Sequence, residues 1–232
     1  IEKNDDEFGA TALASAVDAL RSTGATLRYL GSEGYPPLAI RGSGVEAGGR
    51  VPIRGDVSSQ YLSALLMALP LARGGEHART EVRLTTPLIS RPYVEITTRL
   101  MARFGVDVGT PDAATFVVPE GARYASPGTI AVEGDASSAS YFLAAGVLGG
   151  GPVRVTGVGR NSIQGDVGFA DVLARLGAEV RFGPDWIEAR GGAKLAGGTI
   201  DCTAIPDAAM TLAIVALAAR EKVTLTGIAS WR

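Results

Sequence analysis

The sequence has few residues of the kinds that build metal centres or covalent cross-links. Its 232 residues include one cysteine, Cys202, and one histidine, His77. A single cysteine cannot form a disulfide within the chain, and such cysteine usage is typical of a reducing compartment, so we expect a cytoplasmic protein. One cysteine and one histidine far apart in the sequence also argue against a zinc site or a Cys–His nucleophile pair. We therefore expect no metal ion.

The chain also lacks an excess of charge of either sign and a long apolar run. It has 22 Lys and Arg against 24 Asp and Glu, a net charge of −2, which is not the basic surface typical of nucleic-acid-binding proteins. Its apolar runs are shorter than the roughly 20 residues that span a bilayer, and no secretory leader is recognisable. We therefore expect neither a nucleic-acid partner nor membrane association. A hydrophobic content of 46% predicts a folded globular protein.

What the chain does contain is a motif that occurs twice. Residues 55–62 (GDVSSQYL) and 134–143 (GDASSASYFL) each place a Gly-Asp turn and two serines before a run of small and apolar residues. Such a run predicts a helix, and the free N–H groups and positive dipole at its start attract anions, to which serine hydroxyls add donors. Helix capping by Asp and Ser is the simpler interpretation of a single copy. Two copies favour a phosphorylated ligand.

A second repeated pattern is an amphipathic helix that ends at a glycine and leads into a strand. It occurs three times, with the glycine at Gly24, Gly105 and Gly177. Glycine at this position is typical of a helix C-terminus. Spaced repeats of this kind predict an α/β fold built from recurring units. The strands expected after the three glycines cover residues 25–27, 106–108 and 178–180.

The helices that follow the serine motifs lead into further strands. Alternating residues predict these strands over 80–85, 152–157 and 222–227. A third such helix should begin near Pro206 and Asp207, with the carboxylate of Asp207 in the place of a serine hydroxyl. As an isolated Asp after proline, Asp207 would by default be the N-cap or the first residue of that helix.

Four segments resemble one known family. Residues 55–67 resemble the substrate-binding segment of 5-enolpyruvylshikimate-3-phosphate (EPSP) synthase, and residues 132–143, 161–166 and 205–211 resemble further segments of that family. The resemblance extends over about residues 17–232. It implies an α/β fold with the two-lobed enolpyruvyl transferase-like architecture of repeated βαβαββ units, here as partial lobes.

The resemblance also divides the chain. Residues 1–132 would form a partial shikimate-phosphate-binding lobe, and residues 133–232 a partial second lobe carrying the candidate base. The proline and glycine at residues 125–128 independently indicate a break in the pattern close to this boundary.

The implied reaction transfers the enolpyruvyl group of phosphoenolpyruvate to the 5-hydroxyl of shikimate-3-phosphate and releases phosphate. It belongs to the shikimate pathway of aromatic amino acid biosynthesis, and the family is the target of glyphosate. The implied partners are shikimate-3-phosphate and phosphoenolpyruvate. The reaction needs a proton acceptor, a proton donor and fixed hydrogen-bond donors for two phosphates. It needs no metal or redox cofactor, so the resemblance implies that the chain has no cofactor.

Matching positions supply the candidate site. Ser58 and Ser59 match the pair that holds the 3-phosphate, and Gln60 matches a residue that reaches both substrates. Ser90 matches a further phosphate ligand, although a turn serine before Arg-Pro is an alternative. Tyr93 would pack beside the shikimate ring, although a tyrosine at this position could equally be a core residue.

Two more candidates lie in the second half of the chain. Asp207 matches the base that contacts the 4- and 5-hydroxyls of shikimate. Ser230 stands where the family often places Asn as a hydroxyl contact. Asp135, Ser137 and Ser138 are expected to organise and cap a helix start, and Asp166 to form a turn.

Beside that family the chain looks incomplete. Segments expected before and after it would supply a catalytic lysine, arginines, a Lys-Glu pair and an Asp-His-Arg motif, so we expect weak or no activity from this chain without complementary segments of the enzyme. The alternatives are a non-catalytic fragment that binds shikimate-3-phosphate, a UDP-N-acetylglucosamine enolpyruvyl transferase with a loop cysteine as acid, and an α/β scaffold without a ligand.

Overall fold

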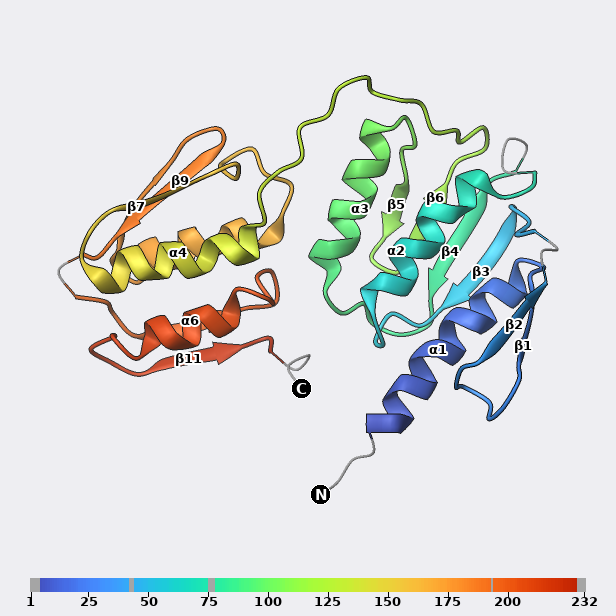
Figure 1. The fold of residues 1–232 in the computed structure, drawn as a ribbon, viewed down its shortest axis with the longest axis horizontal. Helices are drawn as coiled ribbons and strands as arrows, with labels where there is room; N and C mark the ends of the chain where they lie inside the picture. The colour runs from blue at the N-terminus through green and yellow to red at the C-terminus, as the bar shows by residue number, and fades with distance from the viewer. Residues whose placement is uncertain (1–4, 42–43, 75–77, 193, 229–232) are drawn as a thin grey trace. The chain divides into compact units, whose positions relative to one another are not determined.

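The computed structural model describes residues 5–41, 44–74, 78–192 and 194–228. The chain divides after Thr129 into two compact units, which we call unit 1 (residues 1–129) and unit 2 (residues 130–232) (Figure 1). Their hydrophobic cores are separate, since one core cluster lies wholly in unit 1 and the other wholly in unit 2.

Unit 1 contains one complete β-α-β-α-β-β sequence of elements. Its helices are α1 (Asp5–Ser22), α2 (Ser59–Ala68), the 3-10 turn η1 (Leu69–Leu71) and α3 (Arg91–Arg103). Its strands are β1 (Thr26–Tyr29), β2 (Leu38–Arg41), β3 (Gly49–Ile53), β4 (Thr80–Leu84), β5 (Gly109–Asp112) and β6 (Thr115–Val118). The order from β3 to β6 confirms the expected repeating unit, and β1 and β2 form a separate antiparallel pair after α1.

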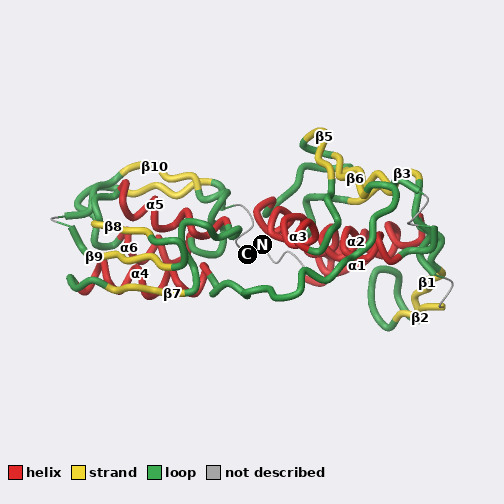
Figure 2. Tube along the Cα trace, turned by 90° about the horizontal axis from the view of Figure 1, so that it is seen from above, coloured by secondary structure: helices red, strands yellow, loops and turns green. Residues whose placement is uncertain are grey.

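The main sheet of unit 1 has the strand order β3-β4-β6-β5. Strands β3 and β4 run parallel, with Ile53 opposite Leu84, whereas β6 is antiparallel to both β4 and β5. Helices α2 and α3 pack against each other and lie on one side of the sheet (Figure 2). The fully buried Leu62, Leu66 and Val82 join this helix layer to the sheet.

Unit 2 repeats the same order of elements in part. Its helices are α4 (Ala136–Gly149), the 3-10 turn η2 (Gly165–Val167), α5 (Gly168–Arg175) and α6 (Ala209–Ala216). Its strands are β7 (Val153–Thr156), β8 (Glu179–Phe182), β9 (Trp186–Arg190), β10 (Gly198–Asp201) and β11 (Val223–Thr226). The antiparallel sheet β7-β9-β8 corresponds to β4-β6-β5 of unit 1, and β10 and β11 form a parallel pair.

Helix α4 packs closely against its neighbours because its buried face consists mostly of small residues. It packs on β7 and β9 and also contacts α6, so Figure 1 shows α4 and α6 between the three-stranded sheet and β11. A Cβ atom on Gly146 would overlap the carbonyl oxygen of Ala189 on β9. Only glycine therefore lets this helix approach the sheet so closely.

The predicted glycine helix ends are confirmed, and they explain one wrong expectation. Gly24, Gly105 and Gly177 all have a positive φ. After Gly105, the N–H of Val106 bonds to the carbonyl of Met101 at 3.0 Å, the 6→1 bond of a Schellman motif. Residues 106–108 are therefore not the expected strand: Val106 completes the helix end, and β5 begins only at Gly109.

The strands predicted at 80–85, 152–157 and 222–227 are confirmed as β4, β7 and β11. Within the described ranges, no helix has both the length and the apolar character needed to cross a membrane.

Candidate functional site

The carboxyl ends of β3 and β4 bring the starts of two helices together. Because these strands are parallel neighbours, the loops that follow Ile53 and Leu84 leave the same edge of the sheet and lead into α2 and α3. A Cβ atom on Gly55 would lie 2.9 Å from the carbonyl oxygen of Thr86, so glycine allows the two loops to touch. The N–H of Ile89 bonds to the carbonyl of Gly55 at 3.0 Å. The two helix starts are thereby held side by side.

Polar side chains fix the first of these loops. Thr86 Oγ1 accepts the N–H groups of Gly55 and Asp56 at 2.9 and 3.1 Å and donates to Asp56 Oδ1 at 2.8 Å. Arg54 Nε and Nη2 bind the two carboxyl oxygens of Asp56 at 3.0 and 2.9 Å. The hydrogen bonds from Arg54 and then Thr86 lower the pKa of Asp56 to about 2. Asp56 is therefore an ionised structural group and a poor proton acceptor at neutral pH.

The serine pair lies at the start of α2. Ser58 is the N-cap, with extended backbone, and its Oγ accepts the N–H of Gln60 at 3.2 Å. Its hydroxyl proton stays available, because a serine oxygen can accept one hydrogen bond while donating another. Ser59 is the first helical residue and is buried, whereas the Gln60 side chain is exposed. Capping and ligand binding are thus compatible at Ser58.

Ser90 occupies the equivalent place at the start of α3. It is the N-cap, with φ 51° and ψ 41°, and its side chain makes no capping hydrogen bond. Ser90 is the single non-glycine residue with positive φ among the residues that the structure describes. The half-buried Tyr93 lies on the first turn, where its N–H bonds to the Ser90 carbonyl at 3.1 Å. Strained backbone of this kind is often found at functional sites.

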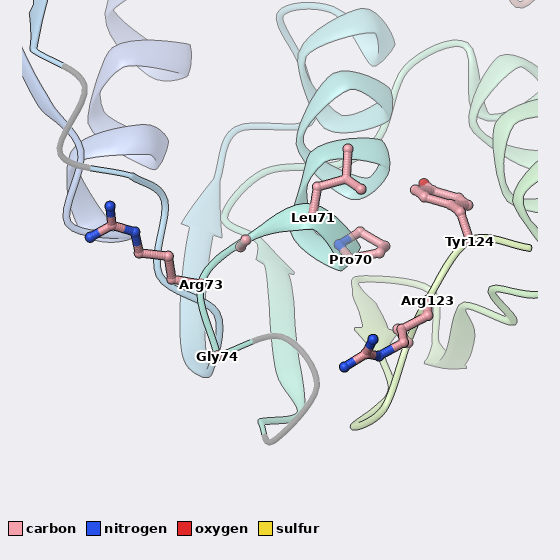
Figure 3. Close-up of a pocket in the computed structure, with 8 residues that line it drawn as sticks. Pro70, Leu71, Arg73, Gly74, Arg123 and Tyr124 are labelled. Atoms are coloured by element: carbon pink, nitrogen blue, oxygen red, sulfur yellow. The ribbon is translucent and has the colours of Figure 1, made fainter.

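A groove of about 400 Å³ opens at the same edge of the sheet. Its walls include Asp18 of α1, Arg54 and Thr85. A second cavity, of about 470 Å³, lies at the other end of α2 and is shown in Figure 3. Its walls, including Pro70 and Tyr124, contain none of the predicted site residues, and it faces the negative end of the helix dipole.

The candidate base Asp207 lies in unit 2, where the expectation for its place in the helix was wrong. Helix α6 begins at Ala209, and its N-cap is Ala208, which makes no side-chain capping bond. Ala208 and Ala209 are fully buried, so core packing, and not the Asp207 carboxylate, sets the helix start. Asp207 is exposed and makes no hydrogen bond or ion pair with the rest of the described chain. Its carboxylate is therefore accessible to a ligand.

Asp166 of η2 contacts the start of α4, and the sequence interpretation underestimated it. Asp135 caps the helix as expected, accepting the N–H of Ser137 at 3.0 Å. Ser137 Oγ also donates to Asp166 Oδ2 at 2.5 Å, and Asp166 is only 6% exposed. Burial, and to a lesser degree the charges of Asp207 and Asp135, raises the pKa of Asp166. No local pattern reveals this, because the segments that bury Asp166 are distant in the sequence.

The remaining candidates divide as follows. Ser230, like His77, lies outside the described residues. Cys202 is fully buried directly after β10, and burial raises the pKa of its thiol, so it is not an exposed loop acid. Ser58, Ser59, Gln60, Ser90 and Tyr93 share the two helix starts of unit 1, while Asp207 belongs to unit 2.

Known proteins of one family are similar to this chain. The EPSP synthase (3-phosphoshikimate 1-carboxyvinyltransferase) family matches residues 5–232. The 3-phosphoshikimate 1-carboxyvinyltransferases of Cupriavidus necator and Laribacter hongkongensis are 55% and 58% identical, over 93% of this chain and 50% of each relative. The solved EPSP synthase of Acinetobacter baumannii is 26% identical with a TM-score of 0.73, covering 94% of this chain and 49% of that one. The chain thus spans about half the length of these relatives. It belongs to the EPSP synthase family.

Proposed function

We propose that the complete protein transfers the enolpyruvyl group of phosphoenolpyruvate to the 5-hydroxyl of shikimate-3-phosphate and releases phosphate. The names of the relatives support this reaction. The observation that carries the proposal is the pair of adjacent helix starts at the carboxyl ends of β3 and β4, each with a serine as its N-cap. Ligands of parallel α/β sheets are typically bound at this edge.

The 3-phosphate of shikimate-3-phosphate would bind at the starts of α2 and α3. The free N–H groups and the partial positive charge of a helix start favour an anion. Ser58 and Ser90 can donate their hydroxyl protons, since the N-cap bond of Ser58 uses only its oxygen and Ser90 makes no capping bond. Ser59 and the exposed Gln60 complete this contact, and Tyr93 packs beside the ring. A chain with net charge −2 needs such local donors to hold an anion.

Asp207 would act on the reacting hydroxyl. It accepts the proton of the 5-hydroxyl as that oxygen bonds to C2 of phosphoenolpyruvate, while C3 gains a proton from an acid. Loss of phosphate and of the C3 proton from the adduct then restores the double bond. The exposed, uncommitted carboxylate of Asp207 supports this role, and Ser230 is a further hydroxyl contact. The acid and the arginines belong to complementary segments of the enzyme in this proposal.

A cytoplasmic location completes the proposal. It is supported by the single cysteine Cys202, which is free and buried.

Binding of shikimate-3-phosphate to this chain, measured by titration calorimetry, tests the phosphate site. Replacing both Ser58 and Ser59 with alanine should weaken binding by more than about tenfold, because each hydrogen bond to a charged group contributes about 1.5–3 kcal/mol. Ser126→Ala is the matched control, since Ser126 lies outside the site and should leave the affinity unchanged. An unaltered affinity in the double variant would refute the assignment of the serine pair.

The role of Asp207 is tested by turnover in a polypeptide completed to the length of the relatives. Asp207→Asn should lower kcat by about 10²–10⁴-fold, the usual contribution of a general base, with little change in the KM for shikimate-3-phosphate. Asp185→Asn, an exposed acid of the same unit, is the control and should keep full activity. Normal turnover in the Asp207 variant would exclude it as the base.

A further inference from the structure

Asp166 is a buried acid that lies where three segments of unit 2 meet. Its side chain is 6% exposed, and Oδ2 accepts the hydroxyl of Ser137 at 2.5 Å. Oδ1 is buried and has no hydrogen-bond partner within the part of the chain that the structure describes. Burying an unpartnered carboxyl oxygen costs free energy. Packing alone therefore does not explain why an aspartate occupies this position.

The three segments are the start of α4, η2 with the start of α5, and the turn that carries Asp207. Ser140 of α4 and Thr211 of α6 are joined by a buried hydrogen bond of 2.9 Å between their hydroxyls. A Cβ atom on Gly168 would lie 3.2 Å from Cγ2 of Ile205, so η2 and the Asp207 turn are in close contact. The backbone N–H of Ala208 also lies beside the Asp166 carboxyl and acts to lower its pKa. Asp166 is thus packed against the residue that follows Asp207.

We propose that Asp166 is a positioning residue, which links the turn of Asp207 to the start of α4 through its hydrogen bond with Ser137 and its packing on Ala208. The proposal rests on the proposed function, in which Asp207 is the base. Asp166 does not contact the reacting atoms in this proposal. It limits the motion of the turn so that the Asp207 carboxylate keeps one direction.

The charges around Asp166 agree with this role. Asp135, the N-cap of α4, and Asp207, on the turn before α6, are both acidic, and their charges act on Asp166. Two carboxylates close together repel when both are ionised. Together with burial, this repulsion raises the pKa of Asp166, so the environment of the carboxyl favours its neutral form. Asp166 can then contact the turn at Ala208 while the Asp207 side chain stays exposed to solvent.

Hydrogen exchange in the 232-residue chain tests the proposal without substrate. The amides of Ala209 and Leu212 bond to the carbonyls of Ile205 and Ala208 and report on the Asp207 turn. Asp166→Ala should accelerate their exchange by about tenfold or more, because exchange follows local stability. The amides of Leu176 and Ala178 at the end of α5 should change less than about twofold.

Two further variants separate positioning from general stability. Asp166→Asn keeps the shape and both a donor and an acceptor, so it should restore slow exchange. Ser137→Ala removes only the hydroxyl bond and should accelerate the same amides by several-fold; it also serves if the Asp166→Ala chain does not fold. Equal acceleration of α5 and α6 amides, or no acceleration near Asp207, would overturn the proposal. Because no substrate is present, a failure here is distinct from a failure of the serine or Asp207 assignments.

Discussion

At the scale of single residues, two aspartates show how the surroundings of a carboxyl group change its pKa and its role. Asp56 is held by the guanidinium of Arg54 and the hydroxyl of Thr86, so its pKa falls to about 2 and its charge supports a loop. Asp166 receives a single hydroxyl and is buried beside other acids, so its pKa rises. The sequence shows the same Gly-Asp pair in both places.

The pH dependence of stability follows from Asp166. Its pKa in the folded chain is raised above the ordinary 3.8, so the fold binds this proton more tightly than the unfolded chain does. The stabilisation is complete below about pH 4 and is lost as pH rises through the folded pKa. Asparagine does not titrate, so Asp166→Asn should gain stability over the parent as pH rises from about 4 to 8.

Urea unfolding at a series of pH values measures this difference. Asp185→Asn, which removes a carboxylate at an exposed position of the same unit, is the control variant. If the unfolding free energy of Asp166→Asn minus that of the parent stays constant or falls as pH rises, the assignment of a raised pKa is wrong.

Ser90 should show a conflict between stability and binding. Its φ of 51° is unfavourable for any residue with a Cβ, so Ser90→Gly should stabilise the chain by about 0.5 kcal/mol. The same change removes a proposed phosphate ligand and should weaken shikimate-3-phosphate binding. Thermal unfolding and calorimetry measure the two effects.

Ser58→Gly is the informative comparison for Ser90→Gly. Ser58 has extended backbone, so glycine relieves no strain there and should cost about a few tenths of a kcal/mol. A lower free energy of unfolding for Ser90→Gly than for Ser58→Gly would show that the positive φ of Ser90 does not destabilise the chain.

At the scale of elements, close packing of small-residue helices distinguishes this chain. Helix α4 approaches β9 so closely that Gly146 has no room for a side chain, whereas Gly149 near its end faces open space. The two glycines share a helix, Gly149 being its last residue, and differ sharply in what surrounds them. They form a matched pair for testing the packing.

Alanine at these positions should act in opposite directions. Gly146→Ala should destabilise unit 2 by about 1–3 kcal/mol, since the sheet or the helix must shift. Gly149→Ala should be neutral or stabilising by up to about 1 kcal/mol, because alanine favours the helix. Urea unfolding followed by tryptophan fluorescence measures both, and equal effects would mean that α4 does not pack as described.

At the scale of the whole molecule, the aromatic residues are divided between the two units. Both tryptophans, Trp186 and Trp231, belong to residues 130–232, whereas five of the six tyrosines belong to residues 1–129. Each unit has its own hydrophobic core. Tryptophan emission therefore follows the unfolding of unit 2, and tyrosine absorbance mainly that of unit 1.

This division gives a test of where the phosphate binds. Shikimate-3-phosphate at about 100 times its Kd should stabilise the unit that binds it by about 2.7 kcal/mol. The tyrosine transition should move to higher temperature, and the tryptophan transition should move less. A larger shift in the tryptophan transition would place the main phosphate site outside the starts of α2 and α3.

The sequence by itself determined many of the elements and some of their ends. The glycine after α3, the apolar spacing of the helices and the alternation of β4 act over a few residues, and short-range backbone preferences decide them. Residues 106–108 were misread because buried valines at a helix end alternate as a strand does. The serine motif also predicted the start of α2 correctly, with Ser58 as its cap.

Only the tertiary structure decided which of these groups meet. The start of α3 lies beside that of α2 because β3 and β4 pair in parallel and Gly55 lets their loops touch. Asp166 is buried because α4 and the Asp207 turn, far from it in the sequence, pack against it. Pairing and burial depend on contacts between distant residues, and no local pattern contains that information.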